Sequence, residues 1–292
     1  MQWLLFVLFV VGPAMGADRI RSVGKLNAAV QAEAKNDMVA AVRAAKEAVE
    51  LDPTHGKAHA FMGQLYYKQQ KYKDAAAAYE AGRKVEKSRV LAADFSYRLG
   101  IVHISMGASL PLTERRALTL QAIAAYTDAI AGYPGHFNAH YRRARAHDWL
   151  DDPDAADADY RQCIRVNPKY SACFVDLATL YADFGFVTEA VAVIEAGLAA
   201  NDNDADMRNG AGGMFLDIGR HAEAIVHFRE ALKIDPDMVE VLFGLGMAYA
   251  EARDRDNAVR NLTEFLTKAG PETPDGIKKA ARDALARMQD AL

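Results

Sequence analysis

The sequence has little of what marks an enzyme or a nucleic-acid-binding protein. Its 292 residues carry 35 Lys and Arg against 39 Asp and Glu, so no excess of positive charge is available for a phosphate backbone. It contains no G-x-S-x-G, P-loop, G-x-G-x-x-G, C-x-x-C or C-x-x-C-H motif. We therefore expect a chain that is not an enzyme, with no catalytic residue, no cofactor, no metal and no nucleic-acid partner.

The first residues lack charge and are followed by small side chains. Residues 1–17, MQWLLFVLFVVGPAMGA, resemble a signal peptide cleaved after Gly16 or Ala17, although no Lys or Arg precedes Trp3. The apolar run is short for a membrane span, and no Cys follows it to accept a lipid. We expect export to the periplasm or the medium. An uncleaved membrane anchor formed by residues 3–12 and a packed cytosolic helix are the alternatives.

Cysteine is scarce as well, with one pair, Cys163 and Cys173, placed symmetrically about Pro168. A short break between two helices would bring these positions close, and export would permit a disulfide. The other interpretation is two small buried residues, because Cys163 stands where other copies of the repeat described next have Ala or Gly.

Alanine, in contrast, recurs with a period of 34 residues, at Ala122, Ala156, Ala190, Ala224 and Ala258. A second series has bulky residues four positions later, and a third has proline in most copies about twelve positions after the alanine. The eighth position of each copy is always Ala or Gly, which suits a close helix crossing. The copies span 22–55, 56–89, 93–136, 137–170, 171–204, 205–238 and 239–272.

These positions resemble those of a tetratricopeptide-repeat protein, and the N-terminus suggests one of the exported bacterial type. The resemblance implies an all-α, right-handed superhelical solenoid of about seven helix-turn-helix repeats over residues 22–272. Residues 273–292 are expected to form a capping helix, with an amphipathic partner or membrane helix as the alternative.

The third copy departs from this period by about ten residues near 104–117. Its first helix is expected to end near His103 and its second to resume around Leu112. Because Leu110, Pro111 and Leu112 are apolar, we expect the intervening loop to fold over the groove or to form a second contact.

The resemblance also implies a concave groove that binds another protein through an extended segment or a helix. The groove positions carried over from the family are Gln64, Tyr67, Lys68, Tyr97, Ile101, Asn138, Tyr141, Arg145, Asp148, Trp149, Val175, Asn209, Phe243 and Met247.

The expected function is a scaffold for assembling an envelope or periplasmic complex. The alternative hypothesis is a membrane-tethered adaptor. The hypothesis from a different functional class is a metal-dependent binding protein or enzyme. It would use His136 and His140, which are four residues apart.

Overall fold

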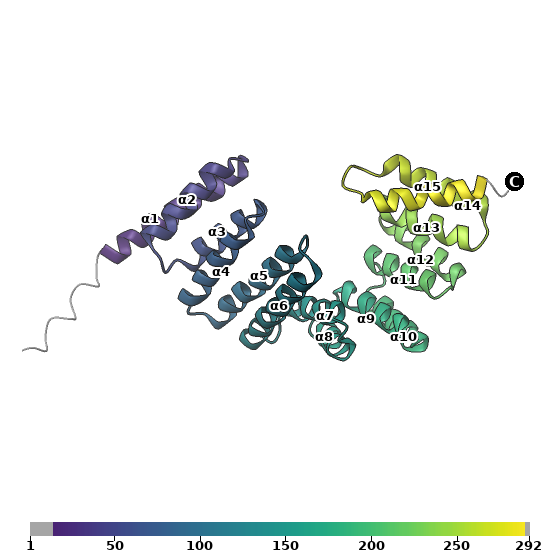
Figure 1. The fold of residues 1–292 in the computed structure, drawn as a ribbon, viewed down its shortest axis with the longest axis horizontal. Helices are drawn as coiled ribbons and strands as arrows, with labels where there is room; N and C mark the ends of the chain where they lie inside the picture. The colour runs from purple at the N-terminus through teal and green to yellow at the C-terminus, as the bar shows by residue number, and fades with distance from the viewer. Residues whose placement is uncertain (1–13, 290–292) are drawn as a thin grey trace, which may run out of the picture. The chain divides into compact units, whose positions relative to one another are not determined.

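The computed structural model describes residues 14–289, and this part of the chain consists of fifteen α-helices without a strand, as Figure 1 shows. The predicted all-α class is therefore confirmed. The helices are α1 (Ala14–Ala34), α2 (Met38–Leu51), α3 (Gly56–Lys68), α4 (Tyr72–Val85), α5 (Arg89–Gly107), α6 (Leu112–Gly132), α7 (Phe137–Trp149), α8 (Pro153–Val166), α9 (Ser171–Asp183), α10 (Val187–Ala200), α11 (Ala205–Asp217), α12 (His221–Ile234), α13 (Val239–Glu251), α14 (Arg255–Lys268) and α15 (Asp275–Gln289).

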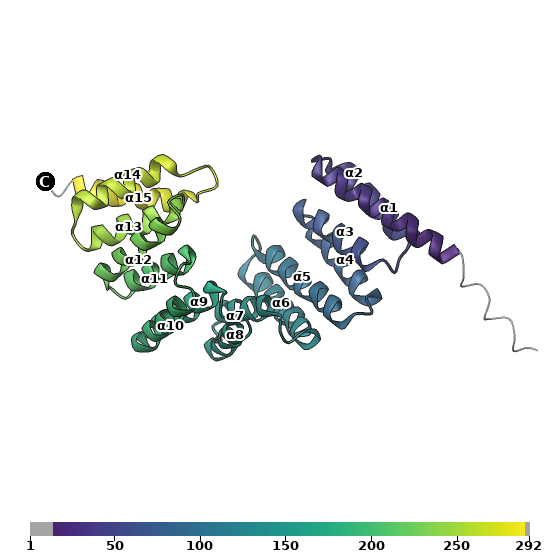
Figure 2. The same cartoon turned by 180° about the vertical axis from the view of Figure 1, so that it is seen from behind.

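The chain divides into two compact units, residues 1–156 and 157–292, with the boundary inside α8. In the first unit, α1 packs on α2, α3 on α4 and α5 on α6, and each hairpin contacts the next. The second unit repeats this arrangement with α9 and α10, α11 and α12, and α13 and α14. Figures 1 and 2 show these hairpins from both sides.

In four hairpins a small residue of the first helix packs against a bulky residue of the second. A Cβ atom added to Gly212 would lie 2.6 Å from the Phe228 ring, and one added to Gly246 would lie 2.7 Å from Leu262. Gly63 and Gly100 meet the rings of Tyr79 and Tyr126 in the same way. The eighth position is therefore small because the twenty-fourth position fills the space above it.

Short turns and side-chain caps set where the helices end and begin. The turn inside a hairpin places one residue in the left-handed region, such as Asn36 at φ 62° or Gly219 at φ 76°. Side-chain caps begin several helices: Asp37 accepts a hydrogen bond from the Ala40 N–H, and Asp204 accepts one from Met207. These local signals set the helix lengths that place the packing positions opposite one another.

The third copy corrects one expectation. The first helix does not end near His103, because α5 continues to Gly107; the second begins at Leu112 as predicted. The extra residues lengthen both helices, and only residues 108–111 connect them. The loop is therefore shorter than the segment 104–117 in which we expected it. At the tip of this hairpin Leu112 is 73% exposed and Leu110 is 38% exposed.

A disulfide joins Cys163 of α8 to Cys173 of α9, with Cα atoms 6.2 Å apart. Both side chains are fully buried. The bridge spans the turn that contains Pro168, so it ties the two helices at the start of the second unit.

The last helix, α15, covers the end of the second unit. Ala281 and Ala284 are buried against Leu262 and Phe265 of α14, and Leu285 and Met288 pack beside them. Ile277, near the start of α15, is 38% exposed. The helix therefore shields the apolar face that a further repeat would otherwise cover.

The predicted signal peptide lies almost entirely outside the described residues, which begin at Ala14 of α1. Within residues 14–289, no helix combines the length and the apolar character that crossing a bilayer requires.

Two adjacent glycines of α11 test the packing rule. Gly212→Ala should lower the free energy of unfolding by about 1–3 kcal/mol, because the added methyl group would overlap the Phe228 ring. Gly213→Ala should raise it by about 0.5–1 kcal/mol, because nothing lies within 4 Å of its Cβ position and alanine is the better helix former. Urea unfolding of both variants measures the difference; equal effects would reject the packing rule.

Candidate functional site

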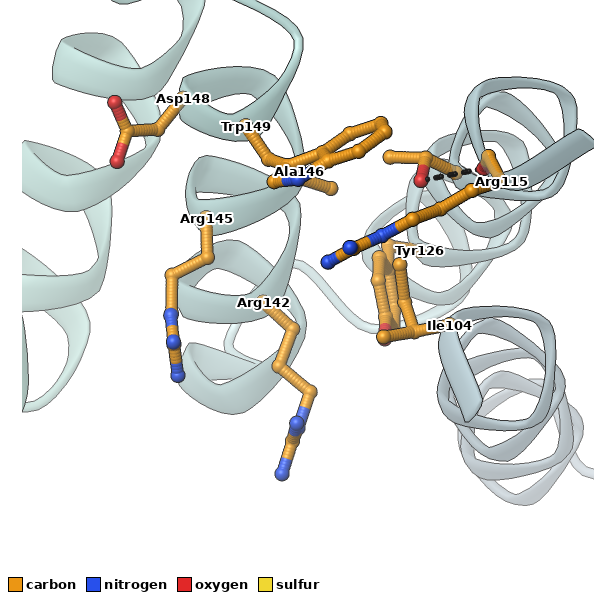
Figure 3. A pocket seen from close by; sticks show the side chains of 9 residues that line it. Ile104, Arg115, Tyr126, Arg142, Arg145, Ala146, Asp148 and Trp149 are labelled. Carbon is orange, nitrogen blue, oxygen red and sulfur yellow. Dashed lines mark hydrogen bonds between the residues drawn. The ribbon is translucent and has the colours of Figure 1, made fainter. Parts of the chain in front are cut away.

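A pocket of about 320 Å³ opens between α5, α6 and α7 of the first unit (Figure 3). We call it the arginine pocket. It is lined by Ile104, Arg115, Thr119, Tyr126, Arg142, Arg145, Ala146, Asp148 and Trp149. Three guanidinium groups and one carboxylate surround it, so its formal charge is positive and its walls are partly aromatic.

The pair formed by Arg115 and Trp149 defines one wall of this pocket. The Arg115 guanidinium carbon lies 4.6 Å from the centroid of the Trp149 ring, within the range of a cation–π interaction. Figure 3 shows the Arg115 side chain extending from α6 alongside the ring that α7 provides. Thr119 lies one turn further along α6 and donates a hydrogen bond to the Arg115 carbonyl, at 2.9 Å.

Arg142 and Arg145 both extend from α7, the helix that also carries Trp149 (Figure 3). Arg142 donates a hydrogen bond from Nε to the Tyr97 hydroxyl at 3.1 Å, which links α7 to α5. The Arg145 guanidinium lies 5.7 Å from the centroid of the Tyr141 ring. Guanidinium groups held in this way match the planar geometry of a carboxylate.

A cluster of aromatic rings lies beside the arginine pocket. Tyr97 lies 4.6 Å from the His136 ring and 6.1 Å from the Tyr126 ring, measured between centroids. Tyr126 is buried, and burial raises the pKa of its hydroxyl above the ordinary value. The hydroxyl therefore stays protonated and adds no negative charge to the pocket.

Several of the predicted groove residues line pockets within the two units. Arg145, Asp148 and Trp149 line the arginine pocket, whereas Val175 and Asn209 line a pocket of about 420 Å³ between α9 and α11. Met247 lines a third pocket beside α15.

The remaining predicted residues contribute to helix contacts. Lys68 pairs with Glu33 at 2.6 Å, and the Tyr67 hydroxyl shares a hydrogen bond of 2.9 Å with that of Ser105. Phe243 packs at 5.4 Å from the Phe265 ring. Gln64, Tyr97, Ile101 and Asn138 are half-buried.

Tyr141 differs most from its expected role. Its side chain is 8% exposed, so a partner can reach little of its ring. A tyrosine near the start of α7 packs into the repeat with its apolar body, and its neighbour Arg145 takes the accessible position.

Sequence reasoning missed Ile104, Arg115, Thr119, Tyr126 and Arg142 as pocket residues. Arg115, Thr119 and Tyr126 lie on one face of α6, at spacings of four and seven residues. This helical spacing was present in the sequence, but the groove positions carried over from the family all lie outside α6.

Comparison with known proteins identifies the repeat. Models of the tetratricopeptide repeat match residues 32–104 and 215–270, residues 137–170, and residues 175–239. The chain belongs to the tetratricopeptide repeat (TPR) family. TPR domains are interaction scaffolds for other proteins.

Relatives of this TPR chain include Superkiller complex protein 3 from Mus musculus, 25% identical over 246 residues. The Homo sapiens protein of that name is 24% identical. Each match covers 82% of the chain but 15% of the relative, so the chain spans a small part of the length of these proteins.

Solved structures with a similar fold include a TPR protein from Parabacteroides merdae, with TM-score 0.65, 15% identity, and coverage of 92% of this chain and 99% of that one. PilW, a type IV pilus biogenesis factor, has TM-score 0.56 and 16% identity, covering 74% and 94%. MamA has TM-score 0.53 and 20% identity, covering 64% and 94%. These similarities describe the TPR fold.

The histidines proposed for metal binding occupy packing positions of the TPR units. His136 Nδ1 accepts a hydrogen bond from the Ala139 N–H at 3.3 Å and caps α7, while His140 Nε2 bonds the Pro134 carbonyl at 3.1 Å. His59 bonds the Pro53 carbonyl at 2.9 Å in the same way. Among residues 14–289, no group of three metal-ligating side chains occurs.

A buried Ser22–His55 pair has the residue types of a nucleophile and its base but not their roles. The Ser22 hydroxyl lies 2.7 Å from His55 Nδ1 and donates its proton to the Ala48 carbonyl, also at 2.7 Å. Both side chains are buried, so a substrate cannot reach them. The pair links α1 to α2 and to the residue that precedes α3.

One buried and three half-buried histidines predict acid sensitivity. Burial lowers the pKa of His55, His103, His136 and His227 below 6.5, so the folded chain favours their neutral form. This contribution to stability is complete above that pH and is lost as the pH falls through 6.5 toward the folded-state pKa values.

We expect the melting temperature to fall between about pH 7.5 and 5.5, measured by circular dichroism. Asp52 does not contribute in this range: partial burial opposes its ionisation, but hydrogen bonds from Arg19 and Thr54 lower its pKa to about 2. A constant melting temperature would contradict the prediction.

Proposed function

We propose that this TPR chain is a non-enzymatic scaffold that binds a segment of a partner protein, extended or helical, at the arginine pocket. The observation that carries the proposal is the contact of Arg115 with Trp149 inside a hollow that also holds Arg142 and Arg145. Tryptophan and arginine are the residue types most enriched at the energetic centres of protein interfaces.

The composition of the pocket favours one kind of segment. An apolar or aromatic side chain would contact Trp149 and Ile104, and a neighbouring Asp or Glu would pair with the guanidinium groups. The hydrogen bond between Arg142 and Tyr97 positions one of these groups before binding. Less side-chain entropy is then lost when the partner binds.

We further propose that the scaffold acts in the cell envelope or periplasm, where it assembles a complex. The disulfide between two buried cysteines supports this location, because structural disulfides persist in oxidising compartments. The similarity to PilW, described as a pilus biogenesis factor, is consistent with it. Tethering of the same scaffold through residues 3–12 is the alternative for its attachment.

Binding is tested by capture of crosslinked partners from native cells on immobilised protein. Trp149→Ala should reduce capture by at least about tenfold, because it removes the aromatic ring that lines one wall of the pocket. Arg115→Gln should reduce it as well, because the charge that faces the partner is lost. Arg116→Gln is the matched control, since this exposed neighbour does not line the pocket and should leave capture unchanged.

Each variant is first shown to be folded by its circular dichroism melt. Equal capture by the wild type, Trp149→Ala and Arg115→Gln would reject the arginine pocket as the binding site.

Location is tested on protein isolated from native cells without reductant. We expect no free thiol under denaturing conditions, because Cys163 and Cys173 are bridged, and a mature chain beginning at Ala17 or Asp18. A retained Met1 with a bridged pair would indicate the tethered form. Two free thiols would contradict export.

A further inference from the structure

A second pocket, of about 330 Å³, lies in the other unit, between α13, the turn into α14 and the capping helix α15. We call it the methionine pocket. It is lined by Met247, Ala250, Glu251, Arg253, Arg255, Ala284, Arg287 and Met288. It shares no residue with the arginine pocket, so its role is independent of the function proposed above.

The floor of the methionine pocket is apolar. Ala284 is buried, and Met247 and Met288 pack partly buried against the cluster formed by Leu262 and Phe265. Methionine side chains are unbranched and polarizable, so they adapt to apolar groups of different shape. The volume is at the lower end of the range for pockets that bind small molecules.

The mouth of the methionine pocket is cationic. Arg253, Arg255 and Arg287 are exposed and are opposed by a single lining acid, Glu251. In the described part of the chain, none of these three guanidinium groups forms an ion pair. An anion placed at the mouth would therefore be attracted without first displacing an internal carboxylate.

Two of these arginines occupy places that the backbone disfavours. Arg253 has φ 61°, in the left-handed region, where the two preceding hairpins have Gly185 and Gly219 and three earlier turns have Asn36, Gln70 and Asp151. A side chain there costs free energy that glycine avoids. Arg255 is the first residue of α14, where the positive end of the helix dipole repels a cation. Neither arginine stabilises the backbone at its own position, and both place a positive charge at the same pocket.

We propose that the methionine pocket binds a small amphipathic carboxylate, with its hydrocarbon chain between Met247 and Met288 and its carboxylate at Arg253, Arg255 and Arg287. The apolar floor and the cationic mouth together match this ligand class, whereas a purely apolar or a cationic molecule satisfies only one of them or neither.

The test uses the full chain labelled at its methionine methyl groups and titrated with sodium octanoate. NMR should show saturable shifts of Met247 and Met288, assigned by single substitutions. Octanol and octylammonium, which lack the negative charge, should bind at least tenfold more weakly. Absence of octanoate shifts, or equal shifts with octanol, would overturn the proposal.

Arg253→Gly separates binding from folding. It should raise the melting temperature, because glycine suits the left-handed turn, yet weaken octanoate binding at least fivefold. Arg287→Gln should weaken binding similarly. Arg282→Gln, an exposed position of α15 that does not line the pocket, is the matched control and should leave the dissociation constant unchanged.

Octanoate binding that neither pocket variant weakens would overturn the assigned site. A protein C-terminus also presents a carboxylate next to an apolar side chain. A peptide with a free C-terminal leucine tests this second kind of ligand. If it binds while octanoate does not, the proposal is also overturned.

Discussion

The structure depends on the contact between a small residue of one helix and a bulky residue of the next. At Gly63, Gly100, Gly212 and Gly246, the space that a Cβ atom would take is already filled by the side chain sixteen or more residues further along the chain. This contact fixes the rotation and depth of each helix in its hairpin. The remaining positions of the repeat then point either to the next hairpin or to solvent, and only the solvent-facing ones are available for binding.

The two pockets proposed to bind ligands lie where the repeat departs from its average. The lengthened α6 carries Arg115 beside Trp149, which an α6 of ordinary length would not reach. The turn after α13 carries Arg253 where the two preceding hairpins have glycine. The regular positions maintain the scaffold, so changes that add function are tolerated at helix ends and turns, where few packed side chains must move.

The repeat positions could be predicted from the sequence because packing in a solenoid repeats with the period of the chain. The resemblance to the TPR family also pointed to Arg145, Asp148 and Trp149, which line the arginine pocket. It could not place Arg115, because the insertion interrupts the period and the family offers no equivalent position. Nor could it show that Tyr141 is buried, since a tyrosine suits both a packed and an exposed site. Spacing alone left the disulfide open, because bridging depends on three-dimensional distance and on redox conditions.

The most direct test of the packing constraint is a double-mutant cycle between Gly212 and Phe228, combining alanine at the first position with leucine at the second. The account predicts that Phe228→Leu is less destabilising when alanine occupies position 212, because the smaller side chain relieves the overlap, with a coupling energy of about 0.5–3 kcal/mol from urea unfolding. Additive effects of the two substitutions would contradict it.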